Sequence, residues 1–94
     1  MAQAAAGVIT CPAASQGRPL ITVQVFDGDP REQADLDPDG RVWDLRAIRP
    51  TSSPAGFFLV CGYGGERRLV PRLPRGVDAC RRSGPVRTPR IACR

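Results

Sequence analysis

The longest apolar run of the chain, FFLVCGYGGERRLV at residues 57–70, predicts a β-hairpin at the centre of the fold. Its first half is apolar at both odd and even positions, which is typical of a strand covered on each side. Gly64-Gly65 then favours a tight type I′ turn, because glycine accepts positive φ. Residues 66–70 are expected to return as the partner strand, which ends at Pro71 because proline cannot donate to the ladder.

Alternating apolar and polar positions predict further strands on either side of this hairpin. Residues 20–26, LITVQVF, alternate as expected for a strand with one buried face. Residues 41–48 alternate in the same way around Trp43 and predict another strand. Short strands are also expected at 77–81 and 90–94, with loops rich in proline and small residues at 12–19, 49–56 and 83–89, while residues 8–12 are expected only to lead into the domain, anchored by Cys11.

One short helix is predicted at residues 30–36. Asp29 is a suitable N-cap and Pro30 a suitable first helical residue. Pro38 disfavours helical geometry in the residue before it and so limits the length.

These elements define a mainly β, small α+β fold: an antiparallel sheet of about four to six short strands, a common sheet size, with one short helix. Residues 8–94 are expected to form a single disulfide-bonded, β-rich domain. Residues 1–7 are expected to be a disordered tail or a remnant of recombinant expression.

The four cysteines, Cys11, Cys61, Cys80 and Cys93, predict two disulfides. The chain has no histidine and no C-x-x-C spacing, which argues against a zinc or thioredoxin-type site. Three connectivities are open. We favour Cys61–Cys80, which joins the central strand to a segment that follows it closely, and Cys11–Cys93, which joins the two ends.

The disulfides indicate an oxidising compartment, so a periplasmic or secreted protein is expected. Residues 1–7 have neither the charged region nor the apolar region of a signal peptide, so we expect a signal to have been removed already. No apolar stretch is long enough to predict a transmembrane segment.

The positive charge consists entirely of arginine and is concentrated late in the chain. Residues 1–45 hold three Arg against seven Asp or Glu, whereas residues 66–94 hold nine against two. Guanidinium groups bind anions well, so a protein or an anionic envelope component is the expected partner. Nucleic acid is disfavoured, because few aromatic side chains are present to stack on bases. A solvated face is the simpler interpretation of charge alone. The candidate binding residues are Arg67, Arg68, Arg81 and Arg82, together with an exposed Tyr63.

The acidic segment contains a partial calcium motif. Asp35, Asp37 and Asp39, followed by a glycine, match the first half of an EF-hand loop. However, the twelfth loop position is Arg46 instead of glutamate, and Pro38 interrupts the loop. A calcium-dependent ligand-binding module is therefore the alternative function, and an acidic turn is the simpler interpretation.

The composition argues against catalysis. Histidine, the usual general base, is missing, and oxidised cysteines provide no thiol nucleophile. The serines have no lysine to activate them. We therefore expect a protein that is not an enzyme, and the sequence indicates no cofactor.

VFDGDPREQADLDPD, then Trp43, LVCGYGG, LPRGVDAC and a terminal CR occur in this order from Cys11 to Arg94. This pattern resembles a family of small, uncharacterised exported proteins of proteobacteria. The resemblance implies a periplasmic or secreted location and structural disulfides, and it implies no activity. The leading hypothesis is a non-enzymatic binding or interaction protein of the cell envelope, inhibitor-like or immunity-like.

Overall fold

The computed structural model describes residues 8–94, so the expected tail at residues 1–7 lies outside the described residues. The strands are β1 (Ile9–Thr10), β2 (Ala14–Ser15), β3 (Arg18–Pro19), β4 (Thr22–Asp27), β5 (Val42–Asp44), β6 (Phe57–Gly62), β7 (Arg68–Leu69), β8 (Ala79–Ser83) and β9 (Arg90–Cys93). Between them lie the α-helix α1 (Leu45–Ile48) and the 3-10 turns η2 (Pro30–Glu32) and η3 (Arg49–Thr51). All strand pairs are antiparallel, which confirms the predicted fold class.

The predicted central hairpin is present, and β6 is the middle strand of the sheet β4-β6-β7. Phe57, Leu59 and Cys61 of β6 face the main core, and Val60 on the opposite face is buried as well, so the strand is covered on both sides as the apolar run predicts. Gly64 and Gly65 both have positive φ, at 94° and 60°. The turn is wider than the predicted two-residue type, because the closing bond runs from the Tyr63 amide to the Arg67 carbonyl at 3.0 Å.

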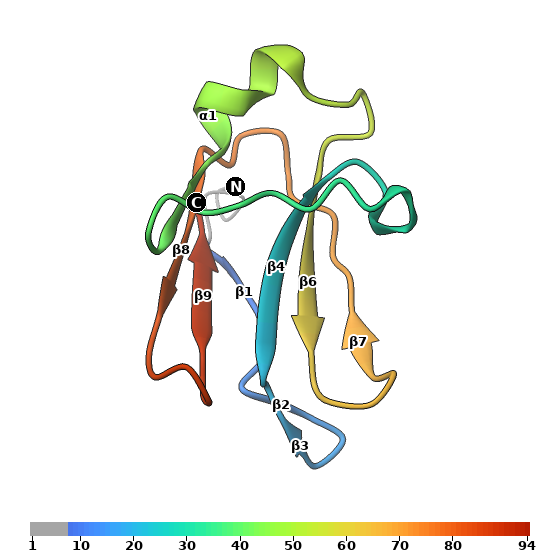
Figure 1. Cartoon of the computed structure of the whole chain (residues 1–94), viewed down its shortest axis with the longest axis vertical. Helices are drawn as coiled ribbons and strands as arrows, with labels where there is room; N and C mark the ends of the chain where they lie inside the picture. Colours follow the sequence, from blue (N-terminus) through green and yellow to red (C-terminus); the bar gives the residue numbers. More distant parts are fainter. Residues whose placement is uncertain (1–7) are drawn as a thin grey trace, which may run out of the picture.

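The second large sheet has the order β1-β9-β8-β5 and brings the two ends of the described chain together. Ile9 pairs with Cys93 and Thr10 with Ala92. The two sheets lie side by side, and α1 with the turn that follows it crosses one end of the molecule (Figure 1). A small hairpin, β2-β3, occupies part of the predicted 12–19 loop.

The disulfide pairing differs from the predicted one: the bonds are Cys11–Cys61 and Cys80–Cys93. Cys80 and Cys93 are direct partners in the β8-β9 ladder, with Cα atoms 3.9 Å apart. Backbone pairing therefore places these two cysteines directly opposite each other. The expectation that the chain ends meet is right, but the β1-β9 hydrogen bonds join them instead of a disulfide.

The predicted helix at 30–36 is wrong beyond Glu32. Asp29 does cap the turn, since its carboxylate accepts from the Arg31 amide at 2.9 Å. Gln33 then takes a left-handed conformation, and the chain extends along the free edge of β4. Two bonds form there, Asp27 N to Ala34 O and Leu36 N to Val25 O, and a longer helix would lose them.

The predicted strand at 41–48 is right only for Val42–Asp44. The chain turns into α1 at Asp44, whose carboxylate accepts from the Ala47 amide at 3.2 Å and caps the helix. Leu45 is the first residue of the helix, and its side chain is fully buried. This helix starts the segment that forms one wall of the site described below.

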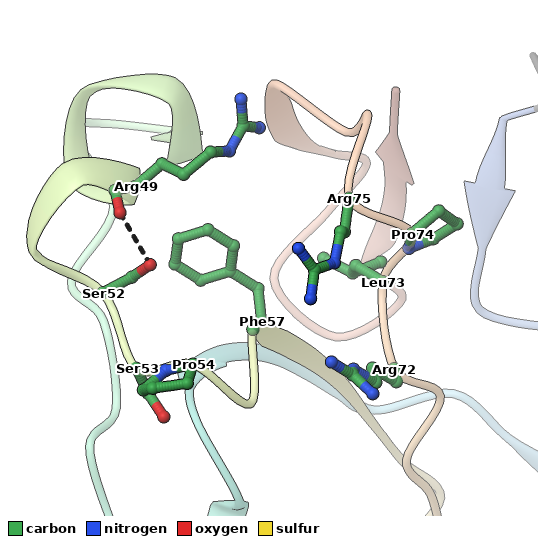
Figure 2. Close-up of a pocket in the computed structure, with 10 residues that line it drawn as sticks. Arg49, Ser52, Ser53, Pro54, Phe57, Arg72, Leu73, Pro74 and Arg75 are labelled. Atoms are coloured by element: carbon green, nitrogen blue, oxygen red, sulfur yellow. Dashed lines mark hydrogen bonds between the residues drawn. The ribbon is translucent and has the colours of Figure 1, made fainter.

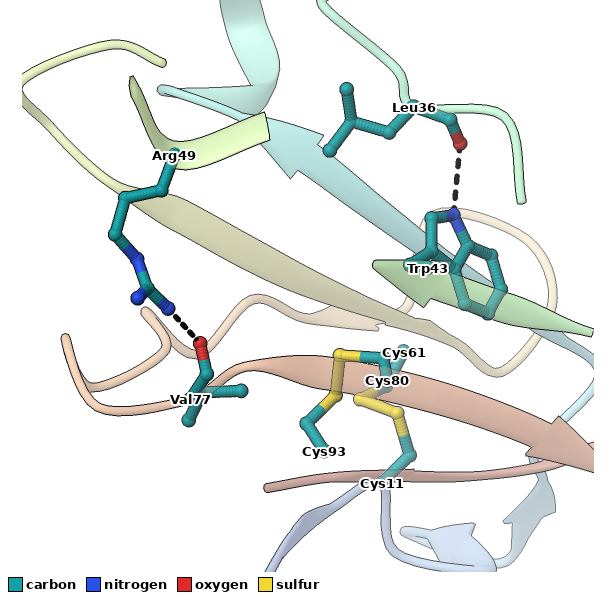
Figure 3. Close-up of a disulfide and its surroundings, with 8 residues drawn as sticks. All are labelled: Cys11, Leu36, Trp43, Arg49, Cys61, Val77, Cys80 and Cys93. Atoms are coloured by element: carbon teal, nitrogen blue, oxygen red, sulfur yellow. Dashed lines mark hydrogen bonds between the residues drawn. A yellow bond between two sulfur atoms is a disulfide. The ribbon is translucent and has the colours of Figure 1, made fainter. Parts of the chain in front are cut away.

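One core holds both large sheets together. The Trp43 indole nitrogen donates to the Leu36 carbonyl at 2.9 Å, so the edge segment after η2 is fastened to β5 (Figure 3). The buried cluster includes both disulfides. Its members are Cys11, Leu20, Val23, Val25, Trp43, Leu45, Phe57, Leu59, Cys61, Tyr63, Leu73, Val77, Cys80, Ile91 and Cys93.

Candidate functional site: a pocket lined by arginines

A pocket of about 360 Å³ opens at the end of the molecule that α1 crosses. One wall is the segment 49–56, which contains η3, and the other wall is the segment 72–75. Figure 2 shows the ring of Phe57 between the two walls, with Arg49 on one side and Arg72 and Arg75 on the other. Three arginines from two separate segments thus line the pocket together with Phe57.

Backbone hydrogen bonds hold the second wall against the sheet. The Leu73 amide donates to the Phe57 carbonyl at 2.8 Å, and Arg72 forms an isolated bridge with Phe58. The side chain of Leu73 is buried in the core, whereas Arg72 directly before it and Arg75 two residues after it are exposed. The wall is therefore an extension of the β6 pairing instead of a free loop.

Arg49 connects the first wall to the segment after the second. Its Nη2 donates to the Val77 carbonyl and lies 3.4 Å from a carboxylate oxygen of Asp78 (Figure 3). On the same wall, the Ser52 hydroxyl donates to the Arg49 carbonyl at 2.8 Å (Figure 2). The Arg49 bonds therefore tie the first wall to residues 77 and 78, which follow directly after the second wall and Gly76.

Arg72 and Arg75 are exposed, and neither forms an ion pair within residues 8–94. The guanidinium of Arg72 lies over Gly56: a Cβ atom built at that glycine would be 3.6 Å from Nε. In the described part of the chain, no aspartate or glutamate is among the residues that line the pocket. The pocket is therefore a concave region of positive charge. We call Arg49, Arg72 and Arg75 the pocket arginines.

The arginines that the sequence singled out do not form one surface. Arg68 is exposed on β7 and Arg81 on β8, and these strands lie on opposite sides of the molecule (Figure 1). Arg67 is half-buried, and its Nη2 donates to the Ser15 hydroxyl at 3.1 Å. Arg67, Arg68, Arg81 and Arg82 are called the strand arginines below.

Arg82 lines a second hollow of about 320 Å³, between β4 and the loop after β8. Ile21 and Val86 on its rim are exposed, at 41% and 75%. This hollow contains a single charged side chain, so it lacks the convergence of the first pocket.

The expectation that Tyr63 is exposed is wrong, because its side chain is buried at 2% exposure. The hydroxyl donates to the Pro12 carbonyl at 2.8 Å, and β6 directs the ring into the core. Burial raises the pKa of Tyr63 above its usual value, while the charge of Arg67 acts in the opposite direction. Tyr63 thus has a structural role.

The acidic segment does not form the predicted calcium loop. In residues 8–94, no three His, Cys, Asp or Glu side chains come together as metal ligands. Asp35 instead bridges to Phe26 at the edge of β4, and its carboxylate accepts from Gln24 at 3.4 Å. The chain is extended through Asp37, whereas an EF-hand loop would curl around the ion.

Asp29 has a local partner as well. Its carboxylate is 2.7 Å from the Arg31 guanidinium, and these hydrogen bonds lower its pKa to about 2. The carboxylates of Asp29 and Asp35 therefore serve local structure.

Sequence reasoning missed the pocket because its walls are far apart along the chain. Arg49 precedes a proline in a predicted loop, and only the topology brings it opposite Arg75. The one readable signal is PRLPR, in which two arginines and two prolines surround the apolar Leu73. That pattern is typical of a segment in which one buried apolar side chain holds the backbone against the core while charged side chains face the solvent.

The fold and the pocket define a small disulfide-bonded β protein with a concave, positively charged pocket at one end. Residues 13–94 match the family described as Type VI secretion system Tli immunity protein, and the chain belongs to this family. This confirms the expected resemblance at the level of a small bacterial family, and it supports an immunity-like interaction protein with a protein partner. The calcium alternative gains no support. No curated protein and no solved structure matches the chain.

Within residues 8–94, none of the helices has the length and apolar character needed to cross a membrane.

Proposed function

We propose that this protein is a non-enzymatic immunity protein that binds a toxic effector of the type VI secretion system in the periplasm and blocks it by direct contact. The family match over residues 13–94 carries the proposal. An immunity protein protects the cell that makes it, so its partner is the effector itself.

The disulfides support the periplasmic location. Both bonds lie in the core, and no cysteine among residues 8–94 is free. Small domains with two disulfides are typical of oxidising compartments, because cytosolic thiols are kept reduced. A protein stationed there meets an effector delivered into the periplasm before the effector reaches its target.

The architecture supports inhibition by contact. Two sheets share one core that contains both disulfides, and this gives a rigid surface. Rigid partners lose little conformational entropy when they associate. Arginine is enriched at the energetic centres of protein interfaces. A platform with arginines around a concave pocket is therefore well suited to hold an effector.

The test is a competition between sibling bacteria. Recipient cells lack both this gene and their own type VI apparatus, and they are mixed with the otherwise identical wild-type parent. We expect the recipients to be killed, and a plasmid that exports the protein to the periplasm should restore their survival.

Two controls make the result specific. Parent cells with an inactive secretion sheath should not kill the recipients, and a plasmid that keeps the protein in the cytoplasm should not protect them. Equal survival of recipients with and without the gene would rule out the immunity function. Protection by the cytoplasmic form would rule out the periplasmic site of action.

A further inference from the structure

We infer that the pocket of Arg49, Arg72 and Arg75 binds a carboxylate side chain, aspartate or glutamate, on an exposed segment of the effector. This inference rests on the proposed immunity function for the identity of the partner. The chemistry of the site rests on the pocket alone. It thus names the part of the surface that recognises the effector and the charge that the effector must present.

The charge of the pocket selects an anion. Arg72 and Arg75 are exposed without an ion-pair partner in residues 8–94, and the described lining has no acidic residue. A guanidinium binds a carboxylate through two parallel N–H···O bonds, which are stronger than neutral hydrogen bonds. Two unpaired guanidinium groups on one wall can hold both oxygens of a single carboxylate.

The floor of the pocket selects an anion with a short apolar stem. Phe57 is 6% exposed and lies between the two walls (Figure 2). The rim also contains Pro54 and Pro74. Glutamate has methylene groups that can pack on such a surface while its carboxylate reaches the arginines, whereas a bare inorganic anion gains nothing from it.

The pocket is preformed, which favours recognition by a small group. Arg49 is held by the Val77 carbonyl and Asp78, so this side chain of the first wall has its position before any ligand arrives. The second wall is fixed by the Leu73–Phe57 hydrogen bond of 2.8 Å, and the prolines restrict both walls further. Preorganised sites pay less entropy on binding.

The concave shape favours a protein side chain over a membrane surface. A lipid bilayer presents a flat array of head groups, which a convex patch of basic residues contacts best. Here the charges converge on a cavity of about 360 Å³, which is large enough to admit a side chain of the partner.

Direct binding is measured by NMR titration of the oxidised protein with the peptide Ac-Gly-Glu-Gly-NH2. We expect shifts in the amide signals of Phe57, Leu73 and Arg75. The matched peptide Ac-Gly-Gln-Gly-NH2 should bind about 10-fold more weakly, because it loses the charge-assisted hydrogen bonds. Inorganic phosphate and vesicles of phosphatidylglycerol are titrated in parallel.

The variant R72Q/R75Q tests the site, and R68Q/R81Q is its matched control. Both double variants remove two exposed positive charges from the formal net charge of +5. The pocket variant should lose the glutamate-dependent shifts, and the control should keep them. Thermal unfolding of both variants verifies that each is folded.

The same variants are then placed in the sibling competition. We expect R72Q/R75Q to protect at least about 10-fold less well than the wild-type protein, as loss of a central arginine contact typically costs an interface. R68Q/R81Q should protect as well as the wild-type protein.

The outcomes separate the two proposals. If the wild-type protein protects and the pocket variant protects equally well, the pocket inference is wrong and the immunity function stands. If the wild-type protein fails to protect, the immunity function is wrong, and the peptide titration alone decides the chemistry of the pocket. Equal binding of the Glu and Gln peptides, or binding of phosphate or vesicles in preference to the Glu peptide, overturns the carboxylate assignment.

Discussion

The pocket arginines and the strand arginines carry the same chemical group, yet their surroundings give them different roles. Arg72 and Arg75 stand without ion-pair partners in the described chain, on a wall that faces Arg49 across a cavity. The guanidinium of Arg67 donates a hydrogen bond to the Ser15 hydroxyl, and Arg68 and Arg81 lie in different sheets. One set converges, and the other is dispersed over the scaffold.

This difference shows that a concave cluster of positive charge depends on convergence in space, and not on the local density of charge along the chain. The Arg67-Arg68 and Arg81-Arg82 pairs are the densest positive positions in the sequence. Neighbours in an extended strand point to opposite faces, so a pair of adjacent arginines separates its charges. Arginines from distant segments can meet where loops of one end converge.

The largest expected effect comes from a change that destabilises the fold on which both sets of arginines depend. In C11A/C61A the cross-link over 50 residues is lost, and the free energy of unfolding should fall by about 4 kcal/mol in the chain-entropy model. Because β6 carries both Cys61 and Phe57, the pocket and the strand arginines should lose their order together. Urea unfolding and amide exchange measure this.

The second disulfide provides the control for that experiment. C80A/C93A removes a cross-link over 13 residues, so its cost should be smaller, about 3 kcal/mol. A larger loss in C80A/C93A than in C11A/C61A would contradict the role assigned to the longer link.

A milder test separates the pocket from the rest of the scaffold. Gly56 has a φ of +86°, and G56A should lower the free energy of unfolding by about 1 kcal/mol because a side chain is strained there. The added methyl meets Arg72 only at van der Waals distance, so the guanidinium should keep its place. Thermal unfolding gives the stability, and titration with the Glu peptide tests whether the pocket survives.

Gly76 is the matched position, since it has no positive φ and a methyl group there meets open space. G76A should leave the stability unchanged or raise it slightly, through a reduced entropy of the unfolded chain. Equal losses in G56A and G76A would show that backbone strain at the pocket wall is not the cause.

The smallest effect concerns Tyr63, beside the strand arginine Arg67. Y63F loses the hydrogen bond to the Pro12 carbonyl, which should cost at most about 1 kcal/mol near pH 7, because Pro12 is exposed and its carbonyl can turn to water. Urea unfolding of Y63F and the wild-type protein at matched pH measures the difference.

The pH dependence sharpens this prediction. Burial raises the pKa of Tyr63 in the folded state, so the unfolded state ionises first and the wild-type stability falls as the pH rises above about 10. Y63F lacks this group, so its stability should fall less, and the gap between the two proteins should shrink. A constant gap from pH 7 to alkaline pH would contradict the buried hydroxyl.

The sequence predicted the strands well where the apolar pattern reflects burial. The run at residues 57–70 became β6 and β7, and residues 20–26 became β4 with only a small shift. The pattern carries this information because alternate positions must face either the core or water. The antiparallel fold class follows from these short strands and their turns.

Pairing and helix length depended on contacts that no local pattern encodes. The β8-β9 register decides that Cys80 meets Cys93, and the register was not readable from cysteine spacing. Likewise, Asp29 correctly predicted the start of a helical turn. After Gln33, however, the chain pairs with the free edge of β4 and the helix does not continue. Tertiary hydrogen bonds outweighed the local preference.

The candidate site was harder still to predict. The expectation that arginine is the recognition group fits the pocket, but the expected positions were strand positions. The pocket required Arg49 to lie opposite Arg75, and this depends on the path of the chain across the end of two sheets.

The pairing of β1 with β9 has a consequence for biosynthesis. The first strand of the described chain takes its place only beside the last one, with Ile9 opposite Cys93. A ribosome or translocation channel releases the residues in order, so β1 can pair only after residues 92 and 93 have emerged. β1 therefore joins its sheet only after every other described strand has emerged, and the backbone groups of Ile9 and Thr10 stay unpaired until then.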